Sequence, residues 1–128
     1  PAMEAEEGNT CGMLPYLEVH KKMFQLADEL DTVPATLPAL MRAQKLQKRA
    51  ARCGVAEKDP EQARQALQQA VKNWDETSSA QAAGDLLFAA ANAMRLAGVD
   101  AEEALTFASK RFCTECLGQE EQCGNQVE

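Results

Sequence analysis

The sequence predicts an all-α protein in which about five helices pack into a bundle. Of its 128 residues, 45% are hydrophobic but only 5% are aromatic, and Ala, Leu and Gln are frequent throughout, as is typical of packed helices. Apolar residues recur at helical spacing, and Pro and Gly separate the runs. No segment shows the alternation of a half-buried strand. The length suits one domain with one core.

Residues 1–29 are expected to form an N-terminal extension with one helix, which begins near Leu14 and ends near Leu30. A rough apolar stripe supports this helix: Leu17, Met23, Phe24, Ala27 and Leu30. Two prolines in residues 31–38 then break the chain. Thr36 is expected to cap the second helix, which covers residues 39–53 and ends at Gly54.

The third helix is expected to open at Asp59-Pro60, since aspartate caps well and proline is tolerated at the first helical position. This helix should run to about Trp74. The fourth helix has three candidate caps and should stop at Gly98; the candidates are Thr77, Ser78 and Ser79.

The fifth helix is expected to begin at Asp100, which forms a capping box with Glu103. It should end beyond Phe112, and residues 113–128 read as a polar tail that frays. The four phenylalanines and the methionines are spaced like core residues.

The net charge of −7 disfavours binding to nucleic acid or to an anionic membrane surface. No run approaches the roughly 18 apolar residues of a membrane span. The acidic start lacks the features of a secretion signal, so the five cysteines suggest reduced thiols and a cytoplasmic location.

Two stretches resemble one family: "LDTVPATLPALMRAQKLQKRAARCG" and "GDLLFAAANAMRLAGVDAEEALTFASKRF". Both are similar to parts of the C-terminal domain of MazG, a member of the all-α nucleoside triphosphate pyrophosphohydrolases. The resemblance covers about residues 30–112. It implies a helical bundle, usually dimeric, with a magnesium site that hydrolyses nucleoside triphosphates to the monophosphate and pyrophosphate.

The resemblance also implies a site of four acids: two glutamates three apart on one helix, then a glutamate and an aspartate three apart on the next. Residues three apart share a helix face. Two facing helices can therefore bring four carboxylates to a hard cation that prefers oxygen ligands. Magnesium would polarise the phosphate chain and activate a water.

Most of these acids are missing here. Asp85, preceded by Gly84 and followed by Leu-Leu-Phe, matches the family aspartate, but the glutamate three positions earlier is Ala82. Residues 62–74 contain no carboxylate. The glutamate pair falls on Ala70 and Asn73, or close by on Gln68 and Gln69. Ser109 and Arg111 stand where the family has asparagine and lysine, which also indicates a degenerate active site.

Asp85 is expected to point into the bundle or its edge, where a basic side chain or an amide of the preceding helix would replace the lost cation. Six basic residues are candidate phosphate contacts: Lys45, Lys48, Arg49, Arg52, Lys110 and Arg111. A solvated helix face or helix-dipole charges explain them as well. Cys113 and Cys116 form a C-x-x-C, for which unremarkable thiols, a redox pair and a zinc site with Cys123 all remain open.

The residues favour a MazG-like domain that has lost catalysis and acts as a dimerisation or weak nucleotide-binding module. The alternative is an active, magnesium-dependent NTP pyrophosphohydrolase that takes its acids from Asp75, Glu76 or a partner chain. No cofactor is expected, apart from magnesium if the site is active. The expected partners are a second copy, with residues 84–97 near the interface, and a nucleoside triphosphate.

Overall fold

The computed structural model describes residues 25–127, with side chains described up to residue 119. After a short helical segment over residues 25–31 come four helices: α2 Ala39–Arg52, α3 Pro60–Thr77, α4 Ala80–Leu96 and α5 Ala101–Val127. The predicted all-α class is confirmed, and no strand occurs among the described residues. Most of the helix predicted to begin near Leu14 lies outside them. None of the described helices is long and apolar enough to cross a membrane.

Side-chain caps set the starts of three helices, as expected. Asp59 accepts a hydrogen bond from the Glu61 amide at 3.0 Å, with proline at the first position of α3. Ser79 accepts from the Ala82 amide at 3.1 Å. Each cap satisfies an amide that has no partner within the first turn.

Asp100 likewise accepts a hydrogen bond from the Glu103 amide at 3.1 Å, so it caps the start of α5. The predicted cap at Thr36 was wrong. The residue before α2 is Pro38, and no side chain caps that end. The helix nevertheless begins at Ala39, because the ring of Pro38 fixes an extended approach and its carbonyl accepts from the Arg42 amide at 2.8 Å.

Glycines end two of the helices at the predicted places. Gly54 follows α2 with φ 77°, and Gly98 follows α4 with φ 80°, a conformation that glycine adopts without steric cost. α3 continues past Trp74 and ends at Thr77, and the cap residue that follows, Ser78, has φ 51°. The Ser78 hydroxyl donates to the Trp74 carbonyl at 2.9 Å and so helps to close this end.

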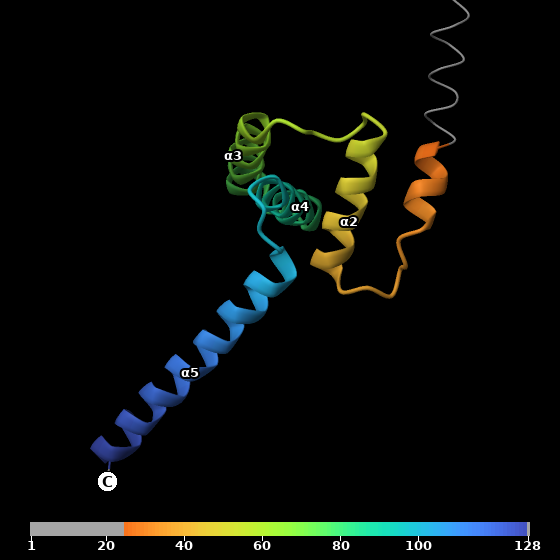
Figure 1. Cartoon of the computed structure of the whole chain (residues 1–128). Coiled ribbons are helices and arrows are strands. Elements are labelled where there is room, and N and C mark those ends of the chain that lie inside the picture. Colours follow the sequence, from red (N-terminus) through yellow and green to blue (C-terminus); the bar gives the residue numbers. More distant parts are fainter. Residues whose placement is uncertain (1–24, 128) are drawn as a thin grey trace, which may run out of the picture.

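α3 and α4 form an antiparallel hairpin that turns at Ser78 and Ser79, and α2 packs against α4 (Figure 1). α5 begins beside α2 and α4 and then projects away from them as one long helix. The chain after Phe112, expected to fray, is instead helical to Val127. No proline interrupts this segment.

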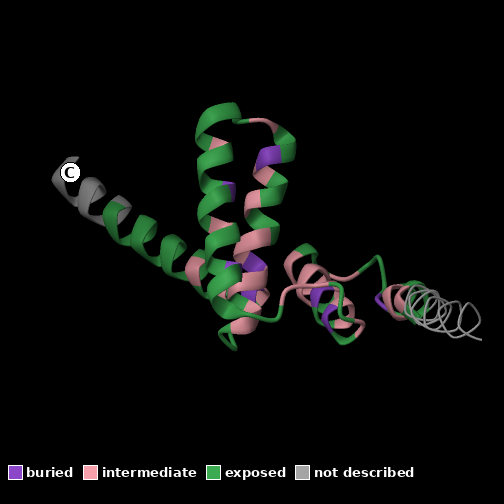
Figure 2. Ribbon diagram, turned by 90° about the horizontal axis from the view of Figure 1, so that it is seen from above, coloured by how far each residue is buried: buried purple, intermediate pink, exposed green. Residues whose placement is uncertain are grey.

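Small side chains dominate the interior of the single chain. The buried residues lie between facing helices, whereas the outer part of α5 is exposed (Figure 2). Among the described residues, the buried hydrophobic ones are Val33, Ala51, Ala63, Ala70, Ala82, Ala91 and Ala101. Phe88, Phe107 and Phe112 are 49%, 58% and 65% exposed. The expectation that they form the core is therefore wrong for one chain alone.

Candidate functional site

The α3 positions that the resemblance assigns to the glutamate pair carry no charged side chain, and their side chains do not form a set of metal ligands. Ala70 is buried. Gln68, Gln69 and Asn73 are exposed. The Gln69 side-chain amide donates to the Asn73 side-chain oxygen at 3.0 Å. These two side chains of α3 are thus joined to each other by one hydrogen bond.

On α4, Ala82 is buried at 8% exposure, close to the turn between the two helices. The sequence predicts that Asp85 points into the bundle or its edge. Its side chain is exposed, so in the described chain it does not point into the bundle. Among the described residues, Asp85 makes no ion pair and no side-chain hydrogen bond, and the predicted basic or amide substitute for a cation is absent there. Water alone can solvate this carboxylate at its position on the surface.

The hairpin does place the two halves of the expected site on neighbouring helices. Asn73 and Asp85 lie at similar distances along the chain from the turn at Ser78 and Ser79. The side chains of Asn73 and Asp85 are both exposed at this level of the hairpin. Within residues 25–119, however, no group of three or more His, Cys, Asp or Glu side chains could hold a metal ion. Asp75 and Glu76 at the end of α3 do not complete such a group either.

The basic stripe of α2 is partly used within the chain. Arg49 donates to the Glu29 carboxylate at 3.3 Å and to the Thr32 hydroxyl at 2.8 Å, and Arg52 lies 3.8 Å from the same carboxylate. Lys45 and Lys48 are exposed. The two arginines therefore connect α2 to the segment before it, whereas the two lysines make no ion pair among the described residues.

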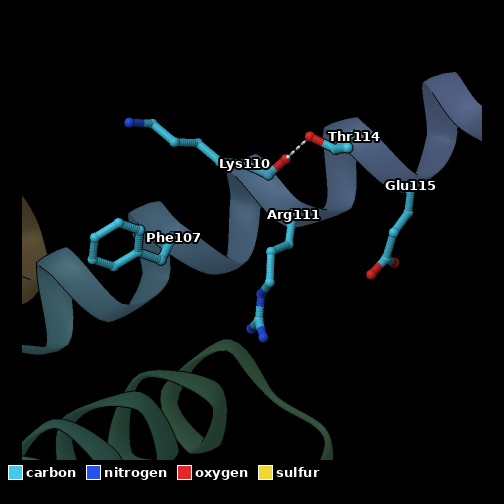
Figure 3. A pocket seen from close by; sticks show the side chains of 5 residues that line it. All are labelled: Phe107, Lys110, Arg111, Thr114 and Glu115. Atoms are coloured by element: carbon cyan, nitrogen blue, oxygen red, sulfur yellow. Dashed lines mark hydrogen bonds between the residues drawn. The ribbon is translucent and has the colours of Figure 1, made fainter.

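The basic residues of α5 do not join this stripe. Figure 3 shows that Lys110 and Arg111 point to different sides of the projecting helix, where the Thr114 hydroxyl donates to the Lys110 carbonyl at 3.1 Å. The shallow pocket there is lined by α5 alone. The six candidate phosphate contacts thus lie on two helices, four on α2 and two on α5, and their binding of a phosphate stays a prediction.

Cys113 and Cys116 are exposed, free thiols on the same projecting helix. In the described part of the chain, no third metal-binding side chain joins them. Cys123, proposed as a further ligand, lies where side chains are not described.

Two glutamines of α2, which sequence reasoning did not single out, connect it to α4. Gln44 donates to the carbonyls of Ala91 and Val99 at 2.9 and 3.1 Å and accepts from the Ala101 amide at 3.0 Å. Gln47, 3% exposed, donates to the Phe88 carbonyl at 2.9 Å. Both follow Leu40 at helical spacing. A polar residue inside an apolar stripe was the signal that could have identified them.

Comparison with known proteins finds relatives that share one description. No protein-family model matches the chain. The chain is 40% identical over 92 aligned residues to proteins described as nucleoside triphosphate pyrophosphohydrolase from Escherichia coli K12 and from Escherichia coli O157:H7. The alignment covers 65% of this chain but only 35% of either relative. The chain therefore spans about a third of the length of the curated relatives it matches.

Proposed function

We propose that this chain, a MazG-like all-α domain homologous to part of a nucleoside triphosphate pyrophosphohydrolase, has lost catalysis and serves as a homodimerisation module. The observation that carries the loss of catalysis is the composition of the α3–α4 hairpin. At the four positions where the family resemblance implies acids, the chain has Ala70 and Asn73, or Gln68 and Gln69 nearby, followed by Ala82, and only the fourth position, Asp85, is acidic.

The chemical reason is the charge that magnesium needs. Mg²⁺ gives up its water ligands reluctantly, and carboxylates compensate for that loss better than neutral amides. Asp85 belongs to no group of three or more potential metal ligands among the described residues, and one exposed aspartate cannot replace four converging carboxylates. A metal site this weak would neither polarise a phosphate chain nor generate a nucleophilic water at a useful rate.

The observation that supports a dimer is the exposure of large apolar side chains. In the described part of a single chain, no large side chain is fully buried, while Leu87, Leu105, Phe112 and Leu117 are each more than half exposed. Leu87 and Leu105 line one apolar hollow, and apolar surface that gathers in one place marks an interaction site in a soluble protein. The α3–α4 hairpin and α2 bury mainly alanines, which contribute little free energy of burial each.

We also propose that the chain makes a weak contact with the phosphates of a nucleotide. Lys45 and Lys48 on α2 are exposed and belong to no ion pair among the described residues. They are the residues best placed to attract a triphosphate to an otherwise acidic protein.

Pyrophosphate release tests the loss of catalysis. With common NTPs and dNTPs and either Mg²⁺ or Mn²⁺, we expect no turnover above background. Turnover of about 1 per second or faster that disappears in Asp85→Ala would contradict the proposal and favour an active pyrophosphohydrolase. Light scattering at tens of micromolar tests the assembly, and a monomeric mass would contradict the homodimer.

A further inference from the structure

An apolar groove lies where α2, α4 and the start of α5 meet. One hollow of about 280 Å³ is lined only by apolar side chains, among them Leu40, Leu87, Met94 and Leu105. A second hollow of about 290 Å³ shares Leu40, Leu87 and Leu105 and continues toward Phe88. Leu87 is 61% exposed and Leu105 is 53% exposed, so the groove is open to a side chain from outside.

α5 carries a matching apolar stripe that extends past this groove. The stripe consists of Ala101, Leu105, Ala108, Phe112 and Cys116, spaced four, three, four and four residues apart. Such spacing places all five on one face of the helix. The first three line the groove, whereas Phe112, at 65% exposure, lies on the projecting part of the helix. No residue of the stripe is charged.

The stripe cannot fill the groove of its own chain. α5 is a single helix from Ala101 to Val127, and its first turns form one wall of the groove. Phe112 is about two turns further along than Leu105, on a helix that leads away from α2 and α4 (Figure 1). Among the described residues, nothing covers the apolar groove or the apolar stripe. In a second copy of the chain, α5 carries an uncovered apolar face that matches them.

We propose that this groove holds α5 of a second copy of the chain, in an antiparallel contact centred near Ala108 and Ser109. Leu105 and Phe112 are seven residues apart, about 10.5 Å along the helix. An antiparallel pair centred midway between them places Leu105 opposite Phe112 of the partner subunit, and Phe112 opposite Leu105 of the partner subunit. The small side chains at the centre allow the two helices to approach closely.

This arrangement obeys the rule for a two-fold dimer, in which the same surface of each copy meets itself. Each Phe112 enters the groove of the other copy, so one contact covers both grooves and both stripes. The inference rests on the homodimer proposed above and specifies its interface.

A charge-complementation experiment, in which opposite charges are introduced at the two paired positions, tests the pairing. Phe112→Glu and Leu105→Lys should each raise the dimer dissociation constant at least about tenfold, which corresponds to about 1.4 kcal/mol. Mixing the two variants should restore a heterodimer. In that heterodimer the introduced lysine faces the introduced glutamate, while the other Leu105 and Phe112 remain a native pair. The mass is measured by sedimentation across a concentration series, and circular dichroism at 222 nm checks that helix content is kept.

Phe107→Glu is the matched control, because Phe107 is equally exposed on α5 but lies roughly 140° around the helix from Phe112. It should leave the dissociation constant unchanged within about twofold. If the wild type is dimeric and Phe112→Glu stays dimeric, this interface is wrong although the homodimer stands. If both single variants are monomeric but the mixture does not associate, the antiparallel pairing is wrong. A monomeric wild type would overturn the homodimer as well.

Discussion

Replacing Gln44 by methionine is expected to lower the free energy of unfolding by about 2–4 kcal/mol. The change keeps the length and flexibility of the side chain but removes its amide. Two partly buried hydrogen bonds are lost, those with the Ala91 carbonyl and the Ala101 amide, at about 0.5–1.5 kcal/mol each. The third bond, to Val99, is exposed and should contribute less.

The Ala101 amide adds to the cost of this change. It belongs to the first turn of α5, where amides have no partner within the helix, and Ala101 is only 3% exposed. Without Gln44 this amide loses its acceptor in a site that water reaches poorly, which costs about 1 kcal/mol or more. The loss of local stability should be largest at the turn between α4 and α5, where Gln44 of α2 makes its hydrogen bonds.

Gln47→Met provides the matched control one turn further along α2. Gln47 is more buried than Gln44, yet it makes one hydrogen bond, and its side-chain oxygen has no partner. Methionine removes that unsatisfied oxygen, and the Phe88 carbonyl keeps its own bond within α4. We expect a change within about 1 kcal/mol, of either sign.

Urea denaturation followed by circular dichroism measures both variants. All samples are compared at one protein concentration, because unfolding of a dimer depends on concentration. The reasoning is refuted if Gln47→Met destabilises the protein more than Gln44→Met does. It is also refuted if Gln44→Met costs less than about 0.5 kcal/mol.

Further predictions concern Asp85 and Ser78. Because Asp85 is exposed and unpaired among the described residues, Asp85→Asn should change stability by no more than about 0.5 kcal/mol. Millimolar Mg²⁺ should not raise the melting temperature of the wild type, since a ligand stabilises only by binding the native state; a rise that vanishes in Asp85→Asn would show a retained magnesium site. Ser78→Gly should stabilise the protein by roughly 0.5–1 kcal/mol, because φ at this position is 51° and glycine adopts such angles freely. The gain is reduced by the lost hydroxyl bond to Trp74, and lower stability by urea denaturation would contradict the strain argument.

The local sequence determined the helices and most of their ends. Asp59, Ser79 and Asp100 cap helices as their side chains predict, and Gly54 and Gly98 stop them, because caps and left-handed turns depend on residues within a few positions. The absence of carboxylates from residues 62–74 could also be read from the sequence, since it does not depend on how the chain folds.

Only the tertiary structure decided which side chains are covered. Apolar spacing predicted Phe107 and Phe112 as core, and Asp85 as inward-facing, but a pattern identifies a face of a helix without identifying what lies against it. The structure leaves Phe107 and Phe112 exposed because α5 leaves the α2–α4 body after its first turns, whereas Asp85 lies on an exposed side of α4. The roles of Gln44 and Gln47 likewise depended on the approach of α2 to α4, since the carbonyls they bind are more than 40 residues away along the chain.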